Sequence, residues 1–433
     1  MNTSYLKGKT NGFEVYSVKT KGLNIEVSKN EIDFATEGES EAIAITVLKD
    51  KKIGFAFTTN AEKFKETADK AISTARANSP DKDFKGFVKP QKTHRIKNYS
   101  DELLDYQLKE FTGFHKTFVK QMHAADKRIM LSNAYFNIGS NTTRVINSEG
   151  VDLEETAALN SFSYEMTINK NGELVAAAGS KGDTKLIKPT VADEAARRTM
   201  ALLGKKPVKT TECAAVLHPE ALAELLSKTL LPNINAENVQ QGKSIFKTLN
   251  KKILSEKLTI TDDATTKGMI ATSSFDCEGT PSQRNNIINK GVLKTFLHNN
   301  YTARQEGKKS TGNASRAYFT LPSVGANNVI IEAGKDKELA SSIKKGVYVR
   351  ELLGVHTMNA LTGDFSLGLL EGFYIEDGKV KYPIKNAMVA GNAYELLNNI
   401  KAVGSEARHA FVGHGAFYLP EVTAGKIKLI GKN

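Results

Sequence analysis

Near the start of the chain, apolar and polar side chains alternate with a period of two. The stretches FEVYSV, LNIEVS, AIAITVL and IGFAF all fall within residues 12–58. In a strand, successive side chains point to opposite faces, so this alternation indicates half-buried antiparallel strands. The alternation therefore predicts a sheet at this end of the chain.

Helices are expected around that sheet. Strands return between residues 129 and 188, where Asn171-Gly172 is a typical two-residue hairpin turn. Three other segments have the spacing of amphipathic helices and begin after a residue suited to cap them. These helices are predicted over 60–78 after Asn60, over 100–128 with Ser100 as the cap, and over 190–204 between Thr190 and Gly204.

A second unit is expected to begin near residue 206, after LLGKKPVK. It opens with the strand ECAAVL and a helix. Beyond residue 255 strands and loops dominate, with Asp377-Gly378 as another hairpin turn. We therefore expect an α+β fold of two domains. The first has a sheet with helices over residues 1–205, and the second is strand-rich over residues 206–433.

Composition narrows the classes of function. The net charge is +12, but the lysines are spread along the chain without an aromatic-interleaved basic stripe, so nucleic-acid binding is not expected. No apolar run approaches the roughly 18 residues of a membrane helix, and no apolar leader is visible. Two cysteines do not suggest a disulfide framework, which favours a reducing cytoplasm.

The helix within VLHPEALAELLSKTLLP (216–232) superficially resembles a zinc helix, because a histidine stands beside a glutamate. An HExxH motif beginning at His218 would need glutamate and histidine where Pro219 and Leu222 stand. We interpret His218 instead as a strand-end residue before a helix that begins with proline. The apolar stripe of a core helix is then Leu222, Leu225, Leu226, Thr229 and Leu230.

Other reactive side chains have structural alternatives. Cys213 lies in an apolar strand and Cys277 lies between carboxylates, and both settings disfavour a thiolate. The pairs Asp262-Asp263 and Asp276/Glu278 could bind a cation or act as an acid and base, but the Gly- and Thr-rich loops around them favour turn capping.

The C-terminal half resembles the TldD/PmbA family. The resemblance rests on FDCEGTPSQRNNIINKGVLKTFLHNNYTARQEGKKSTGNASR (275–316), TGDFSLGLLEGFYIEDGKVKYPIKNAMVAGN (362–392) and GKSIFKTLNKKILSEKLTITDD (242–263). These blocks lie in the family's order and cover roughly residues 205–400. The N-terminal half fits more loosely, through AITVLKDKKIGFAFTTN and the helix after it.

Within this family, the TldD branch is described as a zinc peptidase with an HExxxH helix and a third ligand, a cysteine near the C-terminus. The family register places that motif on residues 227–232, where this chain has Ser227, Lys228 and Pro232. No cysteine occurs in residues 401–433. The resemblance thus implies the PmbA/TldE-like branch. No cofactor is expected in this chain, and zinc is expected only in a TldD-like partner.

The resemblance implies a role in peptide processing. Family members of this kind pair with a TldD-like protein, or with themselves, and act on small peptides. The older label "modulator of DNA gyrase" does not reflect a DNA-binding motif. Neither nucleic acid nor a membrane is expected as a partner. Two alternatives stay open: a peptide-binding or regulatory scaffold without a peptidase partner, and a peptidase with a non-standard metal site built from His356, His409, His414 and Asp364.

The turn STGNASR (310–316) is the segment expected nearest a functional surface. Gly312 and Asn313 suit a tight turn with positive φ. Arg316 could pair with a carboxylate of a substrate or partner. The alternative is that the turn only shapes the domain and that Arg316 forms an internal salt bridge.

Overall fold

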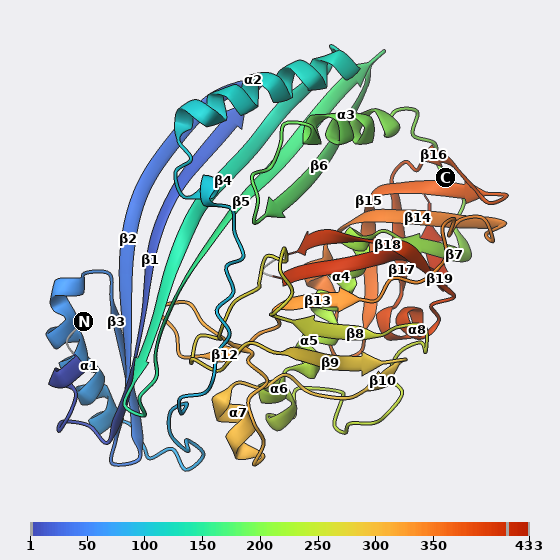
Figure 1. Ribbon diagram of the computed structural model, residues 1–433. Coiled ribbons are helices and arrows are strands. Elements are labelled where there is room, and N and C mark those ends of the chain that lie inside the picture. Colours follow the sequence, from blue (N-terminus) through green and yellow to red (C-terminus); the bar gives the residue numbers. More distant parts are fainter. Residues whose placement is uncertain (1–2, 413–414, 432–433) are drawn as a thin grey trace.

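The computed structural model describes residues 3–412 and 415–431. Residues of the N-terminal half form a long, twisted, six-stranded sheet in the order β3-β2-β1-β4-β5-β6, and every neighbouring pair is antiparallel (Figure 1). Its strands are β1 (Gly12–Ser28), β2 (Glu31–Lys49), β3 (Lys52–Thr58), β4 (Ile129–Asn147), β5 (Asp152–Lys170) and β6 (Glu173–Asp183).

The predicted alternation places neighbouring residues of β1 in two different cores. Phe13 and Val15 pack with the first long helix, α1 (Phe64–Ala77). Tyr16 lies on the opposite face, in a cluster with Phe275 of the C-terminal half. One strand thereby joins two layers, because its side chains alternate between the faces of the sheet.

The helix predicted over 60–78 is confirmed. It begins as a short 3₁₀ turn, η2 (Ala61–Lys63), and continues as α1. The side chain of Asn60 accepts a hydrogen bond of 2.9 Å from the backbone N–H of Glu62, as expected of an N-cap residue.

The helix predicted over 100–128 is correct only in its later part. The chain forms a 3₁₀ turn, η3 (Asp101–Leu103), and the helix α2 (Leu108–Ala125) begins later. Ser100 makes no capping hydrogen bond through its side chain. The carboxylate of Glu110 instead accepts a 3.0 Å hydrogen bond from the backbone N–H of Gln107, which fixes the start of the helix there.

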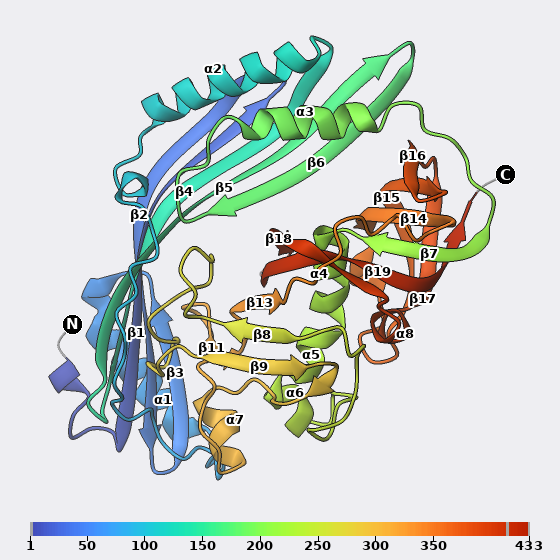
Figure 2. The same cartoon turned by 45° about the vertical axis from the view of Figure 1, so that its right-hand side comes forward.

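The third predicted helix is confirmed as α3 (Val191–Ala201), but the predicted cap Thr190 makes no capping hydrogen bond through its side chain. It packs beside α2 at the end of the sheet away from α1 (Figures 1 and 2). Phe111, Phe118, Phe136 and Phe162 fill the core between these helices and the strands.

Both predicted hairpin turns are confirmed. Asn171 and Gly172 have φ values of 54° and 85° and join β5 to β6. Asp377 and Gly378 have φ values of 48° and 76° and join two strands of the C-terminal half. Positive φ at both central residues is typical of the turn that matches the twist of a hairpin.

The C-terminal half contains an eleven-stranded mixed sheet. Within it, the pairings β7–β14, β14–β15, β15–β17, β17–β19 and β19–β7 close a ring of five strands. The sheet comprises β7 (Thr211–Leu217), β8 (Ile260–Asp263), β9 (Arg284–Asn289), β10 (Val292–Leu293), β13 (Asn328–Ile331), β14 (Lys345–Leu353), β15 (Asp364–Glu376), β16 (Lys379–Pro383), β17 (Ala387–Asn392), β18 (Ala402–Val412) and β19 (Gly415–Ile430).

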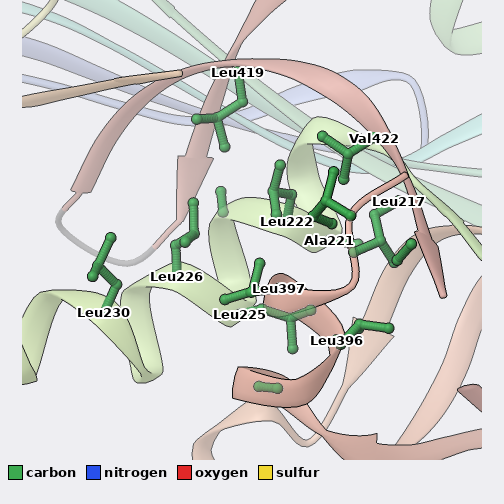
Figure 3. Close-up of a cluster of buried hydrophobic side chains, with 14 of the residues drawn as sticks. Leu217, Ala221, Leu222, Leu225, Leu226, Leu230, Leu396, Leu397, Leu419 and Val422 are labelled. Carbon is green, nitrogen blue, oxygen red and sulfur yellow. The ribbon is translucent and has the colours of Figure 1, made fainter. Parts of the chain in front are cut away.

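The helix α4 (Pro219–Lys228) packs against this sheet and forms the centre of the C-terminal core (Figure 3). The predicted stripe is confirmed, because Leu222, Leu225, Leu226, Thr229 and Leu230 are all 1% exposed or less. The remaining elements are η1 (Thr3–Tyr5), α5 (Leu230–Ile234), α6 (Ala236–Gln240), α7 (Asn300–Gln305), β11 (Ala314–Ser315), β12 (Ser323–Val324), η4 (Val355–Thr357) and α8 (Ala393–Asn398).

The α+β fold class predicted from the sequence is therefore confirmed. The domain boundary between residues 205 and 206 falls in the link between α3 and β7 and stays a prediction. Among the described helices, none is long and apolar enough to cross a membrane.

Candidate functional site

A cavity of about 770 Å³ opens beside the C-terminal end of α4. Ser227, Lys228 and Pro232, the three positions on which the sequence resemblance places the family's zinc motif, all lie in its wall. The other walls come from segments distant in the sequence. These are Asn235 and Asn238, Ser315, residues 324–327 with Val329, residues 352 and 354–356, and the last residue of β18 and the first of β19, Val412 and Gly415.

The chain changes direction within the motif. α4 ends at Lys228, and α5 begins at Leu230. The hydroxyl of Thr229 donates a 2.6 Å hydrogen bond to the carbonyl oxygen of Leu225, and the hydroxyl of Ser227 donates a 2.8 Å bond to that of Glu224. The carbonyl of Pro232 accepts a 2.8 Å bond from the amide of Asn238. These bonds fix the break between the two helices and hold the wall in shape.

The lining offers few metal ligands. Zinc in proteins is held by thiolates, imidazoles and carboxylates. Of these ligand types, the described cavity wall contains the carboxylate of Glu224 and the imidazole of His356. It also contains the ammonium of Lys228, which is not a zinc ligand. Within residues 3–412 and 415–431, no group of three or more His, Cys, Asp or Glu side chains is arranged to hold a metal ion.

The turn predicted near the functional surface touches this cavity through Ser315. Gly312 has φ +71°, as expected, and a Cβ there would lie 2.8 Å from the carbonyl oxygen of Pro281. Asn313, by contrast, does not have positive φ, and the expectation of positive φ there was wrong. Its amide instead donates hydrogen bonds of 2.7 Å to Asp262 and 2.8 Å to the carbonyl of Gly325. This buried amide needs partners that the turn itself does not supply.

Of the two roles left open for Arg316, the structure shows the internal salt bridge. Its Nη1 lies 2.8 Å from Oε1 of Glu14 on β1, and its side chain is fully buried. The guanidinium also lies over the rings of Tyr16 and Phe55. Arg316 thus binds the C-terminal half to the N-terminal sheet just behind the cavity wall.

Asp262 positions another part of the wall. It accepts a hydrogen bond of 2.6 Å from the backbone N–H of Asn327 and one of 3.1 Å from the amide of the same residue. Burial raises the pKa of Asp262 to about 6, although these hydrogen bonds and that from Asn313 lower it. Its neighbour Asp263 accepts hydrogen bonds from Thr265 and Thr266, which is turn capping.

Asp276 has the same capping role. It accepts backbone hydrogen bonds from Glu278 (3.0 Å), Thr280 (2.9 Å) and Ala314 (3.1 Å). Burial raises the pKa of Asp276 to about 7. It also raises the pKa of Glu278 well above the usual range, and the adjacent Asp276 adds to this effect.

Neither cysteine nor His218 is poised for chemistry. Burial raises the pKa of Cys213 to about 11. Burial also raises the pKa of Cys277, with repulsion from Asp276 and Glu278 adding to it. His218 is the N-cap of α4, and its Nδ1 accepts a 3.3 Å hydrogen bond from the backbone N–H of Glu220. Burial lowers the pKa of His218 to about 2, so the ring is neutral.

A second cavity, of about 450 Å³, lies between the two halves of the chain. Arg198 crosses its wall from α3, with Nε 2.6 Å from Glu371 and Nη2 2.9 Å from Glu351. Arg350 lies 3.5 Å from Glu220 and 3.7 Å from Glu371. Burial raises the pKa of Glu351 to about 7, although Arg198 opposes that effect. This network is a further attachment of the N-terminal half to the C-terminal half.

Family models match nearly the whole chain. The model described as the PmbA/TldA metallopeptidase C-terminal domain matches residues 210–431, domain 1 matches residues 13–79, and the central domain matches residues 101–203. An uncharacterised protein of Methanocaldococcus jannaschii is 33% identical over 90% of this chain and 91% of its own length. The chain belongs to the PmbA/TldD metallopeptidase family.

Relatives within the PmbA/TldD family carry more specific names. The metalloprotease PmbA of Escherichia coli O157:H7 is 27% identical, with 96% of this chain and 92% of that protein covered. The crystal structure of TldE from Thermococcus kodakarensis superimposes with a TM-score of 0.93 at 25% identity and covers 99% of this chain and 98% of that chain. The resemblance to the family and the predicted fold are therefore confirmed.

Glu224, Leu352 and Asn327 of the cavity wall were not found from the sequence. Glu224 stands on the polar side of an amphipathic helix, where a solvated residue and a wall residue look the same. Leu352 and Asn327 reach the cavity only through strand pairings over long sequence distances, which no local pattern encodes.

Proposed function

We propose that this chain is a PmbA/TldE-like subunit of a TldD-type metallopeptidase system that processes or degrades small peptides. In this proposal a TldD-like partner holds the zinc, and this chain shapes the substrate chamber. We further propose that it works in the cytoplasm, which the free thiols of Cys213 and Cys277 support.

The observation that carries the proposal is the chemistry at the three motif positions. Ser227, Lys228 and Pro232 line one cavity, in the positions where the family register puts two imidazoles and a carboxylate. Neither serine nor proline supplies an imidazole nitrogen. The Lys228 ammonium would repel a divalent cation, and it cannot act as the base that a carboxylate provides.

Co-purification and metal analysis test this proposal. The tagged chain is isolated from its native cell, its partners are identified, and zinc is counted by mass spectrometry in the chain alone and in the complex. We expect a TldD-like partner, about one zinc per pair, and chelator-sensitive cleavage of an unfolded peptide only by the pair. Stoichiometric zinc and chelator-sensitive cleavage by this chain alone would overturn the proposal.

Two variants of this chain test whether it holds the zinc itself or supports a partner that does. Lys228→Ala in the reconstituted pair should leave the zinc content unchanged, because the proposed zinc lies in the partner. Lys257→Ala serves as the control for loss of a lysine remote from the cavity lining. If Lys228→Ala lowered the zinc content of the pair and Lys257→Ala did not, the assignment of the zinc to the partner would be contradicted.

Two alternatives predicted from the sequence are less well supported. A non-standard metal site would have to gather His356, His409, His414 and Asp364. Asp364 accepts a 2.9 Å hydrogen bond from Asn392, and His409 stacks on Phe411 at 6.0 Å between ring centroids. His414 lies outside the described residues. The other alternative, a peptide-binding scaffold without a peptidase partner, is distinguished by the co-purification.

A further inference from the structure

The two cavities adjoin one another. Glu224, Leu352 and Val412 line both the cavity of about 770 Å³ and the cavity of about 450 Å³. The combined space, here called the α4 groove, runs from the end of α4 to the seam between the halves of the chain. Each cavity alone has the volume of a typical ligand site, so the α4 groove has room for a ligand larger than either cavity could hold alone.

One wall of the α4 groove is an edge strand. β6 is the last strand of the six-stranded sheet, and its residues Ala178, Gly179 and Ser180 line the smaller cavity. Figure 2 shows β6 on the side of that sheet that faces the C-terminal half. An edge strand offers backbone N–H and C=O groups to an added strand, which is how many proteins hold an extended peptide.

Some charged side chains along the α4 groove form ion pairs with their neighbours, and others do not. Arg198 and Arg350 pair with Glu220, Glu351 and Glu371. Glu224, at the junction, is partly buried; within the described residues its carboxylate makes no direct hydrogen bond or ion pair, although the ammonium of Lys228 attracts it electrostatically. Lys228 follows it by one helical turn and lines only the larger cavity. A partly buried carboxylate with no direct hydrogen-bond or ion-pair partner attracts a cationic ligand.

We propose that the α4 groove binds an extended peptide and that Glu224 holds a cationic group of that peptide, either the α-ammonium or a lysine or arginine side chain. The inference rests on the proposed function, which supplies the peptide, and adds the class of peptide. The edge of β6 pairs with the peptide backbone. Lys228 repels a second cation in the larger cavity, so the pair Glu224 and Lys228 sets the direction of the bound chain.

Calorimetric titration of the purified full chain tests the inference. Three five-residue peptides of alanine and serine serve as probes: one blocked at both ends with a central lysine, one blocked at both ends with a central glutamine, and one with a free N-terminus and a central glutamine. The first and third distinguish a side-chain cation from an α-ammonium. We expect at least one of these two to bind five-fold or more tightly than the neutral peptide at low salt.

Variants assign the effect to Glu224. Glu224→Gln keeps the size of the side chain and should remove the preference for the cationic peptide. Lys228→Met should strengthen the binding of that peptide about two-fold or more. Glu256→Gln is the matched control, because Glu256 is an exposed glutamate of a surface ion pair outside the α4 groove, and it should leave the preference unchanged. Thermal unfolding of each variant confirms folding.

Three results would overturn the inference: equal affinity for cationic and neutral peptides, an unchanged preference in Glu224→Gln, or no measurable binding of any peptide. None of these decides the proposed function, which is judged by the partner, the zinc count and the activity of the pair. Conversely, a charge-dependent preference in a chain without a TldD-like partner would support the inference and leave the proposed function overturned.

Discussion

Arg316 donates a 2.8 Å hydrogen bond from Nη1 to Oε1 of Glu14, a residue 302 positions earlier in the chain. The two side chains are 0% and 4% exposed. Burial raises the pKa of Glu14, and Arg316 counteracts this effect. The ion pair therefore joins the N-terminal sheet to the turn beside the candidate site, in surroundings where a charge without a partner is costly.

Removing one partner of this ion pair should destabilise the fold strongly. Arg316→Met leaves the Glu14 carboxylate buried without its cation and is expected to lower the free energy of unfolding by about 3–5 kcal/mol. Urea titration followed by circular dichroism measures the loss. The double variant Glu14→Gln/Arg316→Met should recover part of it, because no buried charge is then unpaired. A double variant that is no more stable than Arg316→Met would contradict this account.

Stability should fall as the pH rises toward neutrality because of Asp276 and Glu278. Burial raises the pKa of Asp276 from 3.8 to about 7 and that of Glu278 in the same direction. Between about pH 4 and 7 the unfolded chain releases protons that the folded chain retains, so this stabilising contribution is complete at low pH and is lost through that range.

Glu278→Gln tests this pH dependence. The glutamine oxygen can still accept the bond that Glu278 receives from the backbone N–H of Asn300 at 2.8 Å. Unfolding by urea at pH 5 should differ little between the two proteins, whereas at pH 8 the variant should be the more stable by roughly 1 kcal/mol or more. Parallel pH profiles for both proteins would refute the role of this carboxyl group.

The core around α4 should tolerate truncation poorly. Leu226 is 0% exposed, so Leu226→Ala removes buried methyl groups and leaves a cavity, at a cost of about 2–5 kcal/mol. Leu353 on β14 is 61% exposed, and Leu353→Ala should change stability by no more than about 0.5 kcal/mol. Chemical denaturation of both variants checks the difference, and similar costs would show that the core assignment is wrong.

Gly312 should resist substitution more strongly than another glycine with positive φ. At Gly312, φ is +71° and a new Cβ would lie 2.8 Å from a backbone oxygen, so both strain and overlap oppose alanine. At Gly307, φ is +63° and no heavy atom lies within 4 Å, so only the backbone strain of about 1 kcal/mol remains. Thermal melting should therefore show a larger loss for Gly312→Ala than for Gly307→Ala, and the reverse order would count against the packing of this turn.

The local elements were largely predictable because their causes are local. The period-2 pattern of β1 and β2, the Asn171-Gly172 turn and the stripe around Leu225 each depend on residues close in sequence. The beginning of α2 was not predicted, because Ser100 and Gln107 are both acceptable caps. The choice depended on Glu110, whose carboxylate accepts from the N–H of Gln107.

The candidate site was predictable only in part. Ser227, Lys228 and Pro232 were identified through the register of a known family. The structure adds what surrounds them, namely Glu224 at the junction of two cavities and the edge of β6. Those neighbours are brought together by a strand ring and by two ion-pair networks between the halves of the chain. Contacts between residues so far apart in the chain produce no periodic pattern in a single sequence.

The strand ring also has a consequence for synthesis. β19 pairs with β7, β13, β17 and β18. The strand that connects the other four is therefore the one that is synthesised last. A ribosome produces β7 and the apolar face of α4 long before it reaches residues 415–430, at about 5–20 residues per second. During that interval the nascent C-terminal half cannot close its sheet. The apolar face of α4 would therefore be open to chaperones that shield apolar surface until β19 has been synthesised.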